Sequence, residues 1–229
     1  MYYFLTASKD TTIFSQQPVQ NTGLDEILEV SKVYYGDLKD TARSLLKFDL
    51  NSLSSKLSTG AVTMSEAQLV MRETLPSEVP LAYSIHIHPI SQSWEMGIGT
   101  RFDNISTDGC TWDYRTSGSK WLNTNVPNGG LATGSYDGKG GMWYTSSEQS
   151  QSYEYQSADL QVDVSSSLSF WLDDNYPNEG FIIKHIDAKE NDDIDYGQLK
   201  FFSKDTNTIY QPKIRIGWDD SRYETGTLI

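Results

Sequence analysis

The chain has 229 residues, of which 37% are hydrophobic and 12% aromatic, so it is long enough and apolar enough to bury a globular core. Its net charge of −13 disfavours nucleic acid and anionic lipid as partners, because both attract basic surfaces. Cys110 is the single cysteine, which excludes an intrachain disulfide, and no apolar run reaches the length of a membrane span. The first residues lack a basic region followed by a cleavage site, so we expect synthesis in a cytoplasm without a signal peptide.

In chain order, short segments alternate between apolar and polar residues, which indicates strands with one buried face. Residues 43–50 are the clearest example, and residues 212–218, near the end of the chain, show the same alternation. Single short helices are expected at residues 51–58 and 166–172. The predicted strands are residues 1–14, 27–35, 43–50, 67–72, 83–89, 152–155, 160–164, 181–186, 198–202 and 212–218. This pattern predicts an all-β sandwich in one domain, residues 1–218, followed by a polar tail at 219–229.

The stretch from residue 94 to about 150 has no clear periodicity and holds four of the six tryptophans. A loop this long inside a compact domain is usually functional or interfacial. Its rings could form the loop's own core, contact another subunit, or stack on sugars. The candidate interface or glycan contacts are Trp121, Tyr136, Trp143 and Tyr144.

Several short motifs follow one another in an order that resembles a known family. Residues 43–50 read RSLLKFDL, residues 65–69 read SEAQL and residues 178–183 read NEGFII. They resemble the arginine-led LLRFDL strand, the SATL strand and the N-x-G-F-x-L segment of DNRLRE-type domains, which are also grouped as a carbohydrate-binding module family. Further pieces in the same order are Asp10, residues 21–23, 28–30, 94–95, 111–113 and 163–164, Trp171, and residues 202–204 and 212–214.

The resemblance implies a jelly-roll β-sandwich. Members of the family occur as appendages of secreted polysaccharide-active enzymes, as adhesin and spore-surface modules, and within virion proteins of tailed phages. This sequence departs from the secreted members in two ways: it has no signal peptide or attached catalytic domain, and residues 115–150 form a long aromatic-rich insertion. Both departures favour a phage virion subunit, made in the host cytoplasm and released by lysis.

Arg43 begins an apolar strand, with Glu29, Asp49 and Glu95 as available partners. A structural ion pair or an arginine at the rim of the core is the preferred interpretation, because charged side chains are rarely buried unpaired. Recognition of a polysaccharide by Arg43 is the alternative.

His86 and His88 are two residues apart on a predicted strand, so they share one face. This spacing occurs in metal sites, but only His185 remains as a further imidazole, so a solvent-facing pair is preferred. Residues 191–195 read NDDID and offer the oxygen ligands that calcium prefers, yet they lack the glycine and the distal glutamate of an EF-hand loop. A solvated acidic turn is therefore preferred there, with calcium as a minor alternative and no other metal or cofactor expected.

No phosphate-binding loop, G-x-S-x-G elbow or H-E-x-x-H motif occurs in the chain. Cys110 with three scattered histidines makes a poor case for a nucleophile, so we expect no enzymatic activity. The expected function is that of a structural protein in the neck, tail or fibre-attachment region of a tailed-phage particle. Its partners would be other virion proteins and copies of itself. The alternative is a carbohydrate-binding module that recognises polysaccharide through aromatic and Arg side chains.

Overall fold

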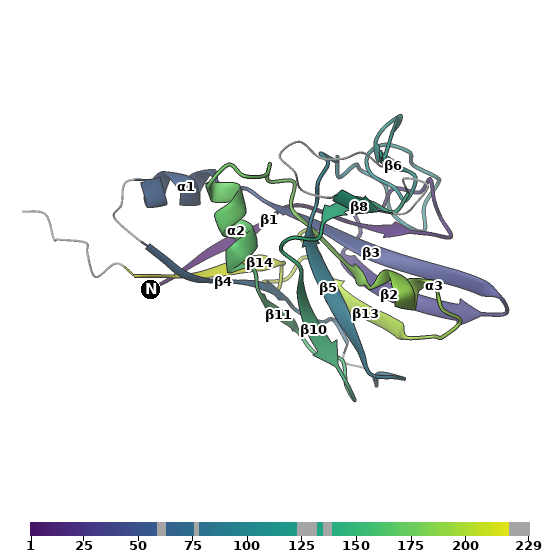
Figure 1. Cartoon of the computed structure of the whole chain (residues 1–229). Helices are drawn as coiled ribbons and strands as arrows, with labels where there is room; N and C mark the ends of the chain where they lie inside the picture. Colours follow the sequence, from purple (N-terminus) through teal and green to yellow (C-terminus); the bar gives the residue numbers. More distant parts are fainter. Residues whose placement is uncertain (59–62, 76–77, 123–131, 135–138, 220–229) are drawn as a thin grey trace, which may run out of the picture.

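The computed structural model describes residues 1–58, 63–75, 78–122, 132–134 and 139–219 (Figure 1). These residues form fourteen strands and three helices. The strands are β1 Tyr2–Phe14, β2 Ile27–Tyr35, β3 Leu38–Phe48, β4 Thr63–Met71, β5 Tyr83–Pro89, β6 Tyr114–Thr116, β7 Ser119–Lys120, β8 Ala132–Gly134, β9 Met142–Tyr144, β10 Gln149–Tyr153, β11 Leu160–Asp163, β12 Phe181–His185, β13 Gly197–Phe202 and β14 Lys213–Asp219. The helices are α1 Asn51–Ser58, α2 Ser165–Leu172 and α3 Asp187–Asn191.

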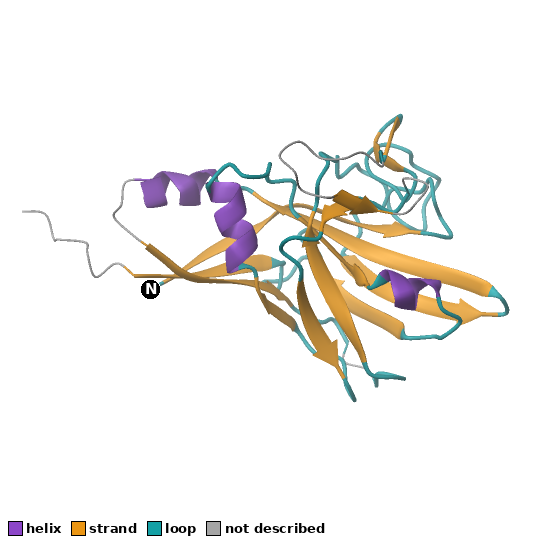
Figure 2. Ribbon diagram, viewed as in Figure 1, coloured by secondary structure: helices purple, strands orange, loops and turns teal. Residues whose placement is uncertain are grey.

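The large strands pair antiparallel in the order β10-β5-β12-β3-β1-β14-β4-β11; β2 also pairs with β3, and β13 pairs with β2. Figure 2 shows how strands dominate the described part of the chain. Strand β1 belongs to both layers of the sandwich. Its first half pairs with β14 and, together with β4 and β11, makes sheet A. Its second half pairs with β3 and, together with β12, β5, β10, β2 and β13, makes sheet B. The all-β sandwich prediction is therefore confirmed.

The core between the two sheets follows from the alternation of apolar and polar residues in the sequence. On β3, Leu46 and Phe48 point inward, as do Ile214 and Ile216 on β14, and all four are buried. The two segments that the sequence singles out thus lie in the two sheets and face a common core. Trp218 is partly buried and packs against the same core, although the register of β14 shifts between Gly217 and Trp218.

Strand β3 starts earlier than predicted, at Leu38, because its first residues form a hairpin with β2. The turn of that hairpin is made by Gly36 and Asp37, which both have positive φ, at 54° and 69°. Such φ values are typical of two-residue hairpin turns, where Gly and Asp are favoured. The polar segment after β2 is therefore a hairpin turn that extends the sheet.

Two helices lie where the sequence predicts them, and one does not. In α2, Leu168 and Trp171 are buried in the sandwich core, and the Trp171 ring lies 4.7 Å from the ring of Phe181. The short helix α3 occupies part of the segment that was expected to be an acidic turn. No helix among the described residues is both long enough and apolar enough to cross a membrane.

In the described part of the predicted insertion at residues 115–150, the regular elements before β10 are the small β6–β7 and β8–β9 pairs. The insertion ends earlier than expected, because β10 already pairs with β5 from Gln149 onward. The predicted polar tail begins inside β14, at Asp219, and residues 220–229 lie outside the described part of the chain.

Candidate functional site

The outer face of sheet B, turned away from the sandwich core, carries a second apolar cluster. Strands β1, β3 and β12 contribute Ile13, Leu45 and Ile182 to it, each fully buried. The long loop contributes most of the remaining side chains, which are Ile90, Trp94, Cys110, Trp121, Met142 and Trp143. The aromatic stretch thus covers sheet B as a third layer.

Three of the four candidate contact residues of this stretch are buried in the chain. Trp121 is 2% exposed, Trp143 3% and Tyr144 0%. The Trp121 ring nitrogen donates a hydrogen bond to the backbone oxygen of Thr111 at 3.0 Å. For these three rings, burial favours the internal-packing alternative over contact with a ligand or subunit. Tyr136, the fourth candidate, lies outside the described residues.

Arg43 forms a buried ion pair on the same outer face. Its guanidinium donates two hydrogen bonds to the carboxylate of Glu190 in α3, and both side chains are 5% exposed. The ion-pair prediction for Arg43 is confirmed, but the expected partners Glu29, Asp49 and Glu95 are wrong. Glu29 instead pairs with Arg101.

Lys184 on β12 joins this pair into a network. Its ammonium lies 2.6 Å from an Asp187 oxygen and 3.5 Å from a Glu190 oxygen, while its side chain is 1% exposed. The two buried cations are therefore balanced by the buried carboxylate of Glu190 and by the carboxylate of Asp187, whose side chain is 63% exposed. Such balance is required there, since a buried charge that lacks a partner is strongly destabilising.

Aromatic rings of the long loop cover the two buried cations. The guanidinium carbon of Arg43 lies 4.7 Å from the Trp112 ring centre and 5.2 Å from that of Trp143. The Lys184 nitrogen lies 4.7 Å from the Trp143 ring centre. Gly140 has positive φ, and a Cβ there would come within 2.6 Å of the Arg43 guanidinium, so a larger residue would displace it. Cation–π contacts in such desolvated places are worth about 2 kcal/mol.

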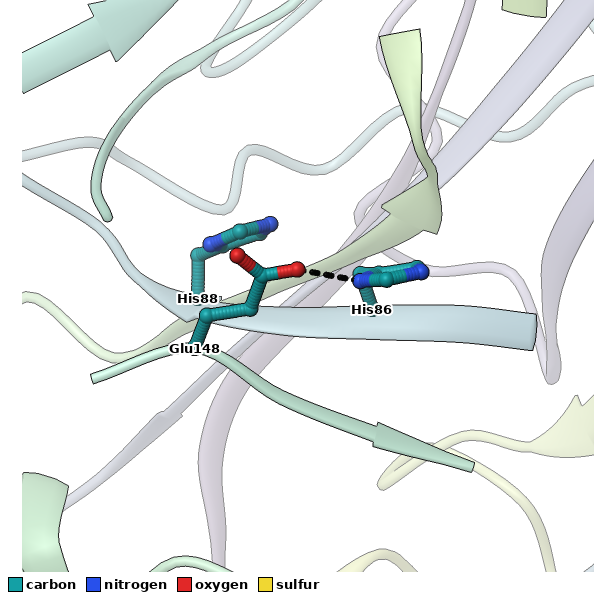
Figure 3. A group of neighbouring side chains, drawn as sticks. All are labelled: His86, His88 and Glu148. Carbon is teal, nitrogen blue, oxygen red and sulfur yellow. Dashed lines mark hydrogen bonds and ion pairs between the residues drawn. The ribbon is translucent and has the colours of Figure 1, made fainter. Parts of the chain in front are cut away.

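His86 and His88 lie at the edge of this network, on β5. Their rings stack with a centroid distance of 6.4 Å and an interplanar angle of 17°. Glu148 lies just before β10, which pairs with β5, and its carboxylate hydrogen-bonds to Nδ1 of His86. Figure 3 shows this carboxylate between the two imidazoles. One ligand atom from each of the three side chains lies within 4.8 Å of the others.

The prediction of a solvent-facing histidine pair is wrong for His88. Its residue is 5% exposed, because the long loop covers this part of sheet B, and Trp143 lies 5.9 Å from its ring. Burial lowers the pKa of His88 to about 4, against the opposing effect of the Glu148 charge. The imidazole is therefore neutral near pH 7, the form in which histidine binds metals. His86, His88 and Glu148 are thus the residues in the described part of the chain that could hold a metal ion.

The acidic segment at residues 191–195 uses its carboxylates within the protein. Asp192 accepts a hydrogen bond from the Tyr196 hydroxyl at 2.7 Å, and Asp195 accepts one from the Gly197 backbone at 2.7 Å. Asp193 pairs with Lys39 at 2.8 Å. These contacts favour the acidic-turn interpretation over the calcium alternative.

A different surface carries exposed apolar side chains. In the loop at residues 97–106, Ile98 is 68% exposed, Phe102 90% and Ile105 72%. We call these three side chains the apolar triad. Phe102 is one of the aromatic rings of the stretch from residue 94 to about 150.

The loop that carries the apolar triad is held firmly at its base. The Asn21 amide oxygen accepts hydrogen bonds from the backbone of Gly23 and, at 2.8 Å, of Gly99. Its amide nitrogen donates to the backbone oxygens of Met96 and Cys110 at 2.8 and 2.7 Å. A single buried side chain thus connects four backbone positions and fixes the loop to the start of the chain.

A further anchor lies beside it, where the Arg101 backbone donates to Asp25 at 3.0 Å and the Arg101 guanidinium pairs with Glu29 at 2.9 Å.

Cys110 is fully buried in the second cluster, and burial raises the pKa of its thiol. A neutral, inaccessible thiol is inert as a nucleophile. The sequence analysis did not single out Glu148, Lys184 or Glu190. Glu148 lies 62 residues from its partner His86 on β5, and Glu190 lies 147 residues from its partner Arg43 on β3.

No protein-family model matches this chain, and the search of curated proteins found no significant relative. The resemblance to the DNRLRE-type family therefore stays a prediction from short motifs.

Proposed function

We propose that this protein is a non-enzymatic structural subunit of a tailed-phage particle, in the neck, tail or fibre-attachment region. It would contact a neighbouring subunit, either another virion protein or a second copy of itself, through the apolar triad. The observation that carries the proposal is the exposure of Ile98, Phe102 and Ile105 on one firmly held loop.

Exposed apolar side chains are common singly, but a group of them on one short loop is typical of a protein contact. Burying a side chain of this size against a partner is worth about 1.5–3 kcal/mol. The anchored base lowers the cost of binding, because the loop backbone is already ordered before the partner arrives. The triad therefore has both the chemistry and the rigidity of an interface.

The residues that carry the family resemblance have architectural roles, which supports a structural protein. The Asn178 amide donates a hydrogen bond to the Phe48 backbone oxygen at 2.8 Å and so ties the start of β12 to the end of β3. Gly180 has φ of 86°, and a Cβ there would come within 2.0 Å of the Leu46 backbone oxygen. These motif residues build the sandwich, and none of them forms a reactive group.

The direct test is mass spectrometry of purified virions of the phage that carries this gene. We expect the chain in the particle at a fixed copy number, and its absence from intact particles would contradict the proposal. Particles assembled with the triple variant Ile98→Ser, Phe102→Ser and Ile105→Ser in place of the unaltered chain should lack this protein. Circular dichroism must first show that the variant folds.

The matched control is a second triple variant at exposed apolar residues outside the triad: Leu75→Ser, Tyr155→Ser and Tyr35→Ser, whose exposed fractions are 75%, 82% and 83%. It removes a similar apolar area and should still be incorporated. Equal loss of incorporation in both variants would show that the triad has no special role.

Carbohydrate binding is the second candidate, and a hollow on the outer face of sheet A, across β14, β4 and β11, favours it. The hollow has a volume of about 230 Å³ and is lined by polar side chains around one ring, namely Arg72, Asp159, Gln161, Tyr210, Gln211 and Lys213, together with Val70. Amide and guanidinium groups beside a tyrosine suit sugar hydroxyls and a sugar face. Retardation on a glycan affinity gel that is lost in Tyr210→Ala would favour this candidate.

A further inference from the structure

We propose that His86, His88 and Glu148 form a binding site for one divalent transition-metal ion, with Zn²⁺ as the best match. The proposal does not depend on the assembly role. It is carried by the placement of two imidazoles on β5 beside one carboxylate just before β10, and by a buried imidazole nitrogen that has no hydrogen-bond partner among the described residues.

The ligand set matches the metal in type and spacing. Zinc takes histidine nitrogens and carboxylate oxygens at about 2.0–2.2 Å, so tetrahedral ligand atoms lie roughly 3.3 Å apart. Here the ligand atoms lie within 4.8 Å of one another. A modest movement of Glu148, whose side chain is 40% exposed and lies outside a strand, would complete the geometry.

The two histidines sit on a rigid platform. Strand β5 is hydrogen-bonded on both sides, to β10 and to β12, so the backbone around His86 and His88 is fixed. Their near-parallel rings hold Glu148 between them (Figure 3). A preordered set of ligands binds a metal with little loss of conformational freedom.

The Nδ1 atom of His88 is buried and has no hydrogen-bond partner among the described residues. A buried polar atom left unsatisfied costs about 1–3 kcal/mol. Because the whole residue is 5% exposed, the atom cannot turn to bulk water. A metal ion lying in the plane of the His88 ring would supply an electron-pair acceptor for a buried nitrogen of this imidazole.

The charges around the site tolerate a cation. Lys184, a neighbouring positive side chain, lies opposite His86 in the β5–β12 pairing, but Asp187 and Glu190 already neutralise it together with Arg43. Glu148 then brings one negative charge for the incoming ion. The partial exposure of His86 and Glu148, at 17% and 40% of their side chains, leaves a path for the metal and room for a water as fourth ligand.

The test uses the untagged full-length chain, stripped of metal with EDTA and titrated with Zn²⁺ by calorimetry. We expect saturable binding of one ion per chain, a higher melting temperature with zinc, and visible d–d absorption bands when Co²⁺ is added instead. The variants Glu148→Gln and His86→Ala, at the exposed side of the site, should weaken binding at least about tenfold. His88→Ala should do the same if circular dichroism shows that it folds.

The matched control is Glu154→Gln, which removes an exposed carboxylate just after β10 and should bind zinc as the unaltered chain does. The proposal is overturned if the unaltered chain binds no Zn²⁺ or Co²⁺ saturably. It is equally overturned if Glu148→Gln and His86→Ala bind as tightly as the unaltered chain, or if Glu154→Gln weakens binding as much as they do.

Discussion

The two faces of sheet B are covered by different kinds of buried side chain. On β5, Ile85 and Ile87 point into the sandwich core, while His86 and His88 point to the outer face beneath the long loop. On β12 the same alternation puts Phe181 and Ile183 inside, and Lys184 with the ion network outside. One set of strands therefore supports an apolar core on one side and a charged, aromatic layer on the other.

The difference shows what each face requires to be stable. The inner face gains from apolar area and close packing, so its stability depends on side-chain volume. The outer face buries charges whose desolvation is repaid only when each one keeps its partner. The stability of the outer face therefore depends on keeping every charged partner, since loss of one group leaves another charge unpaired.

The largest expected effect lies on the inner face. Phe181 is fully buried and packs against Phe48 and Trp171, at ring distances of 6.4 and 4.7 Å. Phe181→Ala should lower the free energy of unfolding by about 4 kcal/mol, because it removes buried area and leaves a cavity. Urea denaturation measures this, and Phe181→Leu should lose clearly less; equal losses would contradict a volume-dependent core.

The next effect tests the completeness of the outer face. Glu190→Ala should lower the free energy of unfolding by about 3 kcal/mol, because it leaves Arg43 without a carboxylate and Lys184 with one alone. Asp187→Ala is the matched control, since that side chain is 63% exposed and Lys184 keeps Glu190. If both variants lose the same stability in urea denaturation, the buried Arg43–Glu190 pair contributes no more to stability than the exposed Asp187 carboxylate.

The third effect is a pH dependence of stability, which comes from His185, a polar side chain on the inner face. Its residue is 1% exposed, its ring packs 4.8 Å from Tyr83, and neither ring nitrogen has a hydrogen-bond partner in the described residues. Burial, with nearby Lys189 and Lys184, lowers the pKa of His185 to about 3. Between pH 6.5, the pKa of this histidine in the unfolded chain, and about pH 3, His185 is protonated in the unfolded chain but neutral in the folded chain. The free energy of unfolding therefore falls as the pH falls towards 3.

This one group should cost about 2 kcal/mol between pH 6.5 and about pH 4.5. His185→Phe keeps a ring between Tyr83 and Tyr196 and cannot bind a proton, so it should flatten that part of the pH profile in urea denaturation. An unchanged slope would mean that His185 is not the group responsible. The slope due to His88, whose pKa is lowered to about 4, should remain.

The smallest effect is expected at the rim of the outer face. Lys47 pairs with Glu179 at 2.7 Å, and the two side chains are 25% and 17% exposed. Because water still reaches both groups, Lys47→Met should change the free energy of unfolding by less than about 1 kcal/mol. A loss as large as that of Glu190→Ala would erase the distinction between the rim and the buried network.

The inner face could be predicted from the sequence, and the outer face largely could not. Alternation over residues 43–50 identifies Leu46 and Phe48 as inward-facing, because a period of two has one structural meaning in a strand. The partner of Arg43 has no such signal: Glu190 lies 147 residues away on a short helix that carries no clear pattern. Local periodicity cannot show which distant segment folds over a sheet.

The same limit explains the histidines. The spacing of His86 and His88 shows that they share a face, but their exposure depends on the long loop, whose sequence has no period. Glu148 lies 62 residues after His86 and meets it only because β10 pairs with β5. Charge and residue type alone could not have selected this carboxylate in so acidic a chain.

The dual membership of β1 has a consequence for the order in which the protein folds. Its second half pairs with β3, so that part of sheet B can form as soon as residues 42–48 have left the ribosome. Its first half must wait for β14, since Tyr2 pairs with Gly217. Contacts between such distant segments slow folding. Sheet A therefore closes late, and until then the first residues of β1 present an unpaired strand edge to other chains.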